Sequence, residues 1–311
     1  MTKSEKTRVL ILGKGLVGSA LIKRLSRDSK YDIVGVGRKE CDLRDSDAVK
    51  NLFSAVNPAI AIFAAGVVGG IEKNLDSPAE LIMENSRIIL NVVEESISCS
   101  LPRLINLVPA CVYPADLNFR MHPRDLFSAP MESSSLPYST AKMAGVIMVD
   151  AIRRQDRRDW FTLISTNLYG DDSAIESHKA HVIPALMKKF KEAKRMNSGT
   201  IALLGDGTPL REFLHADDLA EAVANIMELD QISEGILNVA GPDSISIRGL
   251  AKIIKKVVGF EGAVLFSNDG KNGAPMKLLD GSQMREFGWE PSITLEQGLR
   301  RVQRFNFGAL A

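Results

Sequence analysis

The sequence is poor in cysteine and lacks long apolar runs. Its three cysteines, Cys41, Cys99 and Cys111, form no CxxC pair and are odd in number, which excludes a disulfide framework, gives no metal-site spacing and is typical of a reducing compartment. No run of about 18 apolar residues is present, so no transmembrane helix is predicted. The start MTKSEKTRVLILG lacks the apolar core and cleavage site of a signal peptide. We therefore predict a cytoplasmic protein that does not associate with membranes.

The sequence also lacks an excess of charge of either sign. Its 39 Lys and Arg residues are balanced by 38 Asp and Glu residues, which argues against a non-specific nucleic-acid binder. The hydrophobic content of 45% and the charged content of 25% are ordinary for a globular protein. A chain of 311 residues is long enough for one large domain or two smaller ones.

Short apolar segments alternate with segments of helical spacing over the first 170 residues. Strands that are apolar throughout and alternate with helices are typical of a parallel sheet with both faces covered. The fold class predicted is therefore α/β, with a doubly wound parallel (Rossmann) sheet. The expected strands are Arg8–Leu12, Tyr31–Val36, Ala59–Ala65, Leu104–Val108 and Phe161–Asn167, and the expected helices are Gly15–Arg27, Asp45–Val56, Ala79–Ile97 and Tyr138–Arg154.

The regular alternation ends near residue 170. Beyond it we expect helices at Val182–Ala193, Asp217–Leu229 and Ile247–Val258 and a short strand at Thr200–Leu204. We predict a nucleotide-binding domain over residues 1–170, with elements from about 213–245 returning to it. Residues 171–311 would then form mainly a smaller C-terminal α/β lobe that binds the substrate.

A GxGxxG motif at Gly13–Gly18 directly follows the first predicted strand and opens the first helix. In a dinucleotide-binding unit, Gly13 permits the tight turn, Gly15 lets the backbone approach a pyrophosphate, and Gly18 allows close packing of helix and strand. The helix N-terminus stabilises the phosphate charge. The structural alternative is a simple turn, but the position between strand and helix favours a dinucleotide site.

The end of the second strand indicates which dinucleotide binds. An Asp or Glu there would accept hydrogen bonds from the ribose 2′-hydroxyl of NAD, but this sequence has Gly37, Arg38 and Lys39. Cationic side chains suit the 2′-phosphate of NADP(H), which Arg binds in bidentate fashion. Lys14 is a second candidate cation. We therefore favour NADP(H) over NAD, the alternative being solvated loop charges.

Tyr138 and Lys142 are four residues apart in a predicted helix and share one face. A phenol with an ordinary pKa of about 10 is a poor acid–base group at neutral pH, and a neighbouring ammonium is expected to lower that pKa. Such a pair exchanges a proton with a substrate hydroxyl or carbonyl while a nicotinamide exchanges a hydride. A YxxxK spacing alone is common, but after a glycine loop and four strands it predicts a catalytic pair.

These motifs resemble the extended short-chain dehydrogenase/reductase (NAD-dependent epimerase/dehydratase) family, and within it the GDP-L-fucose synthases. The resemblance runs from about residue 8 to about residue 300. It implies an NADP(H)-dependent 3,5-epimerase/4-reductase of a nucleotide-linked 4-keto-6-deoxy sugar, with a GDP-linked substrate favoured, and a homodimer formed through the two long helices. The segments that carry it are residues 64–71 (AAGVVGGI), 111–114 (CVYP), 137–142 (PYSTAK), 166–170 (TNLYG), 181–186 (HVIPAL) and 211–215 (REFLH).

The resemblance also assigns roles at matching positions. Tyr138 would protonate O4 of the ketone with Lys142 as its partner, and Cys111 and His181 would be the base and acid of epimerisation. The alternatives are a buried structural cysteine and a structural histidine. The implied cofactor-binding residues are Gly13, Lys14, Gly15, Leu16, Val17, Gly18, Arg38, Asp42, Leu43, Ala64, Ala65, Gly66, Lys142, Asn167, Leu168 and His181. The implied substrate-binding residues are Asn167, Lys189, Leu204, Arg211, Lys277 and Asp280.

The sequence departs from the family pattern at several positions. The family usually has a Ser or Thr before the cysteine that donates a hydrogen bond to O4, but this chain has Pro109 and Ala110. Leu204 replaces a Trp, Met276 replaces a basic residue, and the glycine loop is one residue shorter than GxxGxxG. Two alternatives therefore stand beside the full activity: a related sugar-nucleotide epimerase, reductase or dehydrogenase with only part of this chemistry, or a catalytically inactive dinucleotide-binding protein.

Overall fold

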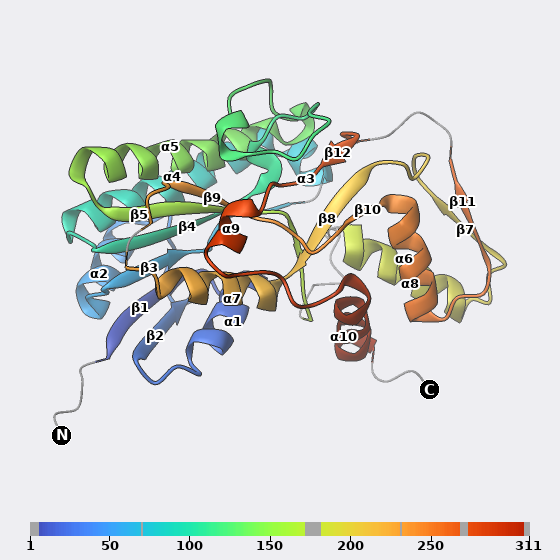
Figure 1. Cartoon of the computed structure of the whole chain (residues 1–311), viewed down its shortest axis with the longest axis horizontal. Coiled ribbons are helices and arrows are strands. Elements are labelled where there is room, and N and C mark those ends of the chain that lie inside the picture. The colour runs from blue at the N-terminus through green and yellow to red at the C-terminus, as the bar shows by residue number, and fades with distance from the viewer. Residues whose placement is uncertain (1–5, 70, 172–181, 231, 268–272, 308–311) are drawn as a thin grey trace.

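A six-stranded parallel sheet forms the larger lobe of the computed structural model (Figure 1). The structure describes residues 6–69, 71–171, 182–230, 232–267 and 273–307. The strand order β2-β1-β3-β4-β5-β9 reverses direction between β1 and β3. The strands are β1 (Thr7–Leu12), β2 (Tyr31–Val36), β3 (Ile60–Phe63), β4 (Arg103–Pro109), β5 (Asp159–Ser165) and β9 (Ile236–Val239).

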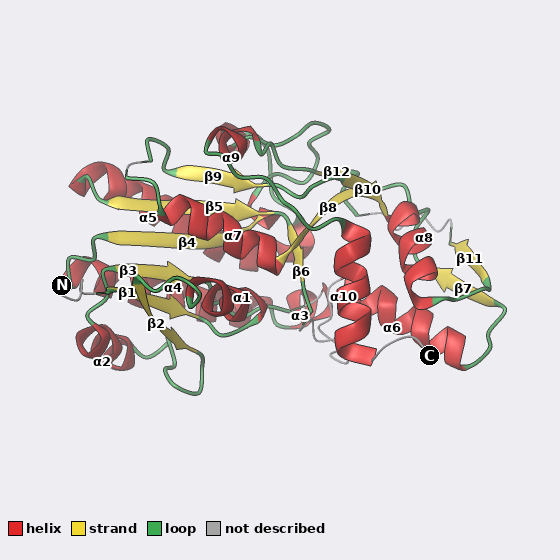
Figure 2. Cartoon of the chain, turned by 60° about the horizontal axis from the view of Figure 1, so that its bottom comes forward, coloured by secondary structure: helices red, strands yellow, loops and turns green. Residues whose placement is uncertain are grey.

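Helices cover both faces of this sheet, so the predicted doubly wound fold is confirmed (Figure 2). One face packs against α1 (Leu16–Leu25) and α7 (Ala216–Met227), and the other against α2 (Ser46–Val56), α4 (Pro78–Ser98) and α5 (Leu136–Asp156). Successive strand residues point to opposite faces. Ile11 accordingly joins the cluster with Leu21 and Val223, while Leu10 joins Phe53 and Val92 in the other.

Local sequence signals explain where several elements begin and end. The Asp45 carboxylate accepts hydrogen bonds from the backbone N–H groups of Asp47 (2.9 Å) and Ala48 (3.1 Å), which caps α2. Helix α5 begins at Leu136, two residues before the predicted start, because Pro137 suits a first helical turn.

The predicted strand Phe161–Asn167 is divided in two. Strand β5 ends at Ser165, and β6 (Asn167–Tyr169) pairs instead with β8 (Leu210–His215). The side chains of Thr166 and Asn167 both donate to the Glu212 carbonyl at 3.1 Å, which directs the chain out of the main sheet.

The smaller lobe has its own apolar core, which includes Met187, Phe190 and Ile254. Strand β8 pairs with β10 (Ser244–Ser246), β12 (Met276–Lys277) and β6, and β7 (Thr200–Leu203) pairs with β11 (Ala263–Phe266). The helices of this lobe are α6 (Val182–Arg195), α8 (Ile247–Val258) and α10 (Leu295–Phe307). Helix α8 begins at a Ser246 cap and ends at Gly259, whose φ of +70° is the left-handed conformation that glycine favours.

The remaining elements are short. They are α3 (Ile71–Asp76), α9 (Ser282–Glu286) and three 3₁₀ turns, Ala110–Val112, Pro123–Asp125 and Ser133–Ser135. Within the described ranges, none of the helices has the length and apolar character needed to cross a bilayer.

Candidate active site

The reversal of strand order between β1 and β3 sets the position of the candidate site. In open α/β sheets, ligands bind at the carboxyl ends of the strands beside such a switch point. Gly13 follows β1 there, and Ala64, Ala65 and Gly66 follow β3. Gly13 has a φ of +111°, and a Cβ on it would lie 2.9 Å from the Ala65 nitrogen. The two predicted cofactor segments therefore lie in contact, and Gly13 is required for that contact.

The glycine loop fits a dinucleotide. A Cβ on Gly18 would lie 1.7 Å from the Gly13 carbonyl oxygen, so Gly18 permits close packing of helix and loop. A Cβ on Gly15 would meet no atom within 4 Å, and Gly15 is the N-cap of α1, which has no side-chain cap. Leu16 and Val17 form the first turn of α1. An uncapped helix N-terminus beside open space suits a pyrophosphate.

The cations predicted to bind the 2′-phosphate differ in their surroundings. Arg38 is exposed. Lys14 instead forms an ion pair with Glu40 at 2.9 Å, and Glu40 also accepts a hydrogen bond from the Gly37 N–H. Both contacts hold the pKa of Glu40 below its ordinary value, the Lys14 hydrogen bond first. To bind the 2′-phosphate, Lys14 would have to give up its ion pair with Glu40, which the sequence analysis did not predict.

Asp42 and Leu43 line the turn after β2. The Asp42 carboxylate accepts hydrogen bonds from the Arg44 guanidinium, and this contact lowers the pKa of Asp42 to about 2. Arg44 also pairs with Glu84 of α4. Leu43 is buried, and its carbonyl accepts a hydrogen bond from Asn91 at 2.9 Å. The turn is thus fixed by a buried leucine and a charged network.

Tyr138 and Lys142 lie on one face of α5, next to the end of β3. The Lys142 Nζ donates to the Ala65 carbonyl at 2.9 Å and lies 6.0 Å from the centre of the Tyr138 ring. A Cβ on Gly66 would approach the same Nζ to 2.8 Å. The structure therefore joins the predicted catalytic pair to the predicted cofactor segment.

The predicted effect of Lys142 on the phenol is wrong for this structure. Burial raises the pKa of Tyr138, with Cys111 as a second cause, and no lowering by the ammonium offsets it. The reason is that Lys142 is itself buried and bonded to a carbonyl; burial lowers its pKa to about 8. Tyr138 is consequently a neutral phenol, the form that can donate a proton.

Cys111 lies close to this pair, in the 3₁₀ turn after β4. Burial raises the pKa of its thiol, and a hydrogen bond from Ser139 and the nearby charges of Lys277 and Lys142 act in the opposite direction. The structure thus brings three of the four predicted catalytic residues together. His181, the fourth, lies outside the described residues.

The predicted substrate residues fall into two groups, one on or near β8 and β12 and one on α6 and just beyond β7. Arg211 and Lys277 are paired in register on β8 and β12. The Asn167 side chain of β6 donates a hydrogen bond to the backbone carbonyl of Glu212, which follows Arg211 on β8. Asp280 accepts a hydrogen bond from the Ser282 N–H at 2.8 Å. Leu168, which was predicted to bind the cofactor, follows Asn167 on β6 and is partly buried. Lys189, on α6, and Leu204, just beyond β7, are both exposed.

Two acidic residues that the sequence analysis missed organise this region. Glu132 forms an ion pair with Lys277 at 2.9 Å; burial opposes its ionisation, but Lys277 holds its pKa below the ordinary value. Glu212 is completely buried, pairs with Arg120 and accepts a hydrogen bond from the Leu279 N–H at 3.0 Å. Glu212 lies within the REFLH segment, and this segment was the sequence signal that could have identified it.

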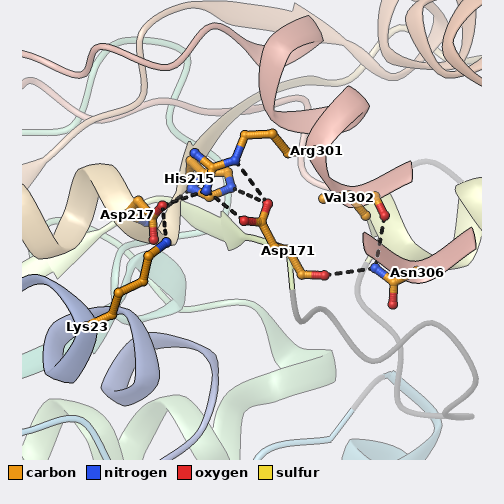
Figure 3. A network of polar contacts seen from close by, with 7 residues as sticks. All are labelled: Lys23, Asp171, His215, Asp217, Arg301, Val302 and Asn306. Atoms are coloured by element: carbon orange, nitrogen blue, oxygen red, sulfur yellow. Dashed lines mark hydrogen bonds and ion pairs between the residues drawn. The ribbon is translucent and has the colours of Figure 1, made fainter. Parts of the chain in front are cut away.

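A charged network connects the two lobes next to the site (Figure 3). Arg301 of α10 donates to Asp171 and to Asp217, at 2.6 Å each, and Asp217 also binds Lys23 of α1 at 3.1 Å. The buried His215 contacts Asp171 at 3.3 Å, and burial lowers its pKa. The network joins α1, α7 and α10 to the chain directly after β6.

Comparison with known proteins agrees with this geometry. The model of the NAD dependent epimerase/dehydratase family matches residues 9–240. The chain belongs to this family. Among its relatives within the epimerase/dehydratase family, a probable GDP-L-fucose synthase 1 of Oryza sativa subsp. japonica is 37% identical over 94% of this chain and 89% of that protein. The GDP-L-fucose synthase of Escherichia coli (strain K12) is 36% identical over 94% of both chains.

A solved member with a similar fold is MlghC, a GDP-mannoheptose C4 reductase from Campylobacter jejuni with NADP bound. It superposes with a TM-score of 0.86 at 27% identity and covers 97% of this chain and 98% of its own. The parallel sheet and the switch point described above therefore occur in an NADP-binding relative.

Proposed function

We propose that the chain is an NADP(H)-dependent 3,5-epimerase/4-reductase of a GDP-linked 4-keto-6-deoxy sugar. The observation that carries the proposal is the proximity of Cys111 to Tyr138 and Lys142, at the switch point that holds the glycine loop. A reductase needs a proton donor at the ketone, and an epimerase needs a base beside the carbons that flank it. The cluster contains a group for each task.

The residues divide the chemistry between them. The Cys111 thiolate removes the proton α to the ketone, which the carbonyl makes acidic, and His181 returns a proton from the other face of the sugar ring. Gly13–Gly18, Ala64–Gly66 and Arg38 would hold the dinucleotide, whose nicotinamide would supply the hydride for C4. Tyr138 gives its phenolic proton to O4, and Lys142, whose Nζ donates to the Ala65 carbonyl, ties this helix to the cofactor segment. Arg211 and Lys277 hold the diphosphate.

Purified protein, NADPH and GDP-4-keto-6-deoxymannose in D₂O test the proposal. We expect a fall in absorbance at 340 nm together with deuterium at C3 and C5 of the sugar, detected by mass spectrometry. Deuterium without NADPH oxidation would leave only the epimerase, an outcome that the missing hydroxyl at Pro109 and Ala110 would explain. If neither NADPH oxidation nor deuterium incorporation is observed, the proposal is overturned. Thermal-shift measurements with GDP-, UDP-, dTDP- and CDP-sugars identify the preferred nucleotide.

Replacing Arg38 by Ala is expected to raise the Kd for NADPH about 10-fold or more, since a hydrogen bond to a charged group contributes about 1.5–3 kcal/mol. The Kd for NADH, which lacks the 2′-phosphate, should stay nearly unchanged. Fluorescence titration of both cofactors measures the difference. Lys50→Ala, which removes an exposed cation from α2, is the control. Equal weakening of NADPH and NADH would contradict the assignment of Arg38.

We also propose a cytoplasmic homodimer. Met83, Leu90 and Ile97 of α4 are spaced by seven residues and are 52%, 43% and 38% exposed, and Ile147 of the adjacent α5 is 49% exposed. Residues seven apart lie on one helix face. Such a two-helix apolar face suits pairing with a second copy of itself. The cytoplasm agrees with three cysteines that are all unpaired.

The dimer is tested by replacing Leu90 with Glu. A carboxylate at the centre of an apolar interface is costly to bury, so light scattering after size exclusion should change from two chains per particle to one. Leu265→Glu on β11 introduces the same charge at a residue that is 54% exposed in the other lobe and should leave the particle mass unchanged. A wild-type protein with one chain per particle would disprove the dimer.

A further inference from the structure

One loop, residues 114–135, connects the two halves of the proposed catalytic cluster. Cys111 lies in the 3₁₀ turn before the loop, and Tyr138 lies in the first turn of α5 after it. The loop itself contains only two 3₁₀ turns and isolated bridges, so contacts with other segments must hold it in place. A displacement of the loop would therefore reach the side chains that react with the sugar.

The middle of this loop is fixed to both lobes at Met121, which is completely buried. The Met121 N–H donates to the Leu278 carbonyl, and the Met121 carbonyl accepts from the Asp280 N–H, at 2.8 Å each. The same carbonyl accepts a hydrogen bond from the buried Asn238 side chain of β9 at 2.8 Å. Met121 therefore joins the loop to the main sheet and to the segment that follows β12.

A buried carboxylate next to Met121 completes this junction. Glu212 of β8 is completely buried, and its two oxygens have different partners: Oε1 accepts from Arg120 of the loop, and Oε2 accepts from the Leu279 N–H at 3.0 Å. Arg120 also donates to the Leu279 carbonyl at 2.9 Å. A buried carboxylate without its cation keeps an uncompensated charge, so Glu212 favours one arrangement of the loop, β8 and the segment after β12.

The strands joined to the loop carry the two cations that we assign to the diphosphate. Arg211 directly precedes Glu212 on β8 and is paired in register with Lys277 on β12. Lys277 also forms an ion pair at 2.9 Å with Glu132, near the end of the loop. The loop contacts thus connect the cations that would hold the nucleotide to the side chains that would react with its sugar.

We propose that Glu212 is a positioning residue that fixes the separation between the diphosphate cations and the reacting side chains. It acts through Arg120 and the loop, and so sets how the sugar of a bound nucleotide lies against Cys111 and Tyr138. The inference rests on the proposed function and concerns a residue to which the resemblance assigns no role. A misplacement of about 1 Å can cost about 10²-fold in rate, so loosening this junction should impair turnover more than nucleotide binding.

Protection of Cys111 by GDP-mannose, a nucleotide sugar without the reactive ketone, tests the proposal without turnover. Iodoacetamide alkylates the thiolate, and peptide mass spectrometry of the full-length protein gives the rate with and without saturating GDP-mannose. In the wild-type protein the sugar should cover Cys111 and slow its alkylation. Glu212→Gln has one accepting oxygen in place of two, so one contact of the junction must be lost. We expect this variant to keep the wild-type Kd for GDP-mannose, measured by calorimetry, and to lose the protection of Cys111.

Matched variants separate positioning from a general loss of structure. Arg120→Met leaves Glu212 without its cation and should also lose protection at an unchanged Kd. The double variant Arg120→Met/Glu212→Gln should recover part of the protection that Arg120→Met loses, because replacing both members of a buried pair costs less than breaking it. Arg124→Met, at an exposed cation of the same loop, should behave as the wild type. The buried Cys41 should resist alkylation in every folded variant.

Full protection of Cys111 in both Glu212→Gln and Arg120→Met would overturn this inference and leave the proposed function intact. If Glu212→Gln does not fold, Arg120→Met decides the question, because the Arg120 side chain is half-exposed. A wild-type protein that does not bind GDP-mannose, or binds it without protecting Cys111, would overturn the proposed function and this inference with it. The two failures are therefore distinguishable.

Discussion

Replacing Tyr138 by Phe is expected to slow NADPH oxidation about 10²–10⁴-fold, the usual contribution of a positioned proton donor. The substitution removes only the hydroxyl, so the packing of α5 and the Lys142 contact with Ala65 should persist. The loss should therefore appear in kcat and not in the Kd for NADPH. Stopped-flow absorbance at 340 nm measures the rate over the wide range required.

The same variant distinguishes the two halves of the proposed reaction. Proton removal by Cys111 does not use the phenol, so deuterium should still enter the sugar at C3 and C5. Tyr169→Phe is a matched control, because the buried Tyr169 hydroxyl has no hydrogen-bond partner within the described part of the chain. A Tyr138→Phe enzyme that oxidises NADPH at nearly the wild-type rate would remove Tyr138 from the mechanism.

Alanine at Gly18 should destabilise the fold, whereas alanine at Gly15 should leave its stability nearly unchanged. A Cβ on Gly18 would lie 1.7 Å from a backbone oxygen, so the loop or the helix must shift. We expect Gly18→Ala to reduce the free energy of unfolding by about 3 kcal/mol or more. Gly15→Ala meets no atom within 4 Å, and its φ of −78° suits any residue, so Tm should hardly change.

The effect of Gly15→Ala should instead appear in cofactor binding. The added methyl group occupies the space through which a pyrophosphate approaches the start of α1. We expect the thermal stabilisation by NADPH, which is about 2.7 kcal/mol at 100 times the Kd, to fall sharply. Gly199→Ala, also free of contacts but in the smaller lobe, is the control and should retain it. Full stabilisation of Gly15→Ala by NADPH would place the cofactor elsewhere.

The order of the elements in the larger lobe was predictable because buried parallel strands are apolar along their whole length. Strands β1 and β2 and helix α8 occur within a residue of the predicted bounds. The strands of the smaller lobe were harder to predict. Strands β10 and β12 have three and two residues, too few to show a period, and they exist because β8 lies between them.

The candidate site was predictable only where one local motif carried it. Tyr138 and Lys142 lie within one helix, so their spacing was informative. Glu132 and Lys277 are 145 residues apart, and Arg120 and Glu212 are 92 apart, so no local pattern could join them. The shift in the pKa of Tyr138 was predicted in the wrong direction because a YxxxK spacing says nothing about how deeply both side chains are buried.

The pairing of α1 with α7 has a consequence for synthesis on the ribosome. The two helices cover the same face of the sheet, yet Lys23 and its partner Asp217 are 194 residues apart. At about 5–20 residues per second, roughly 10–40 s pass before α7 can cover α1 and the first strands. During that interval the apolar side chains of Leu21 and Leu25 have no native partner on α7. The nascent chain is therefore exposed to aggregation at its N-terminal half, and chaperone supply should affect its yield more than its final stability.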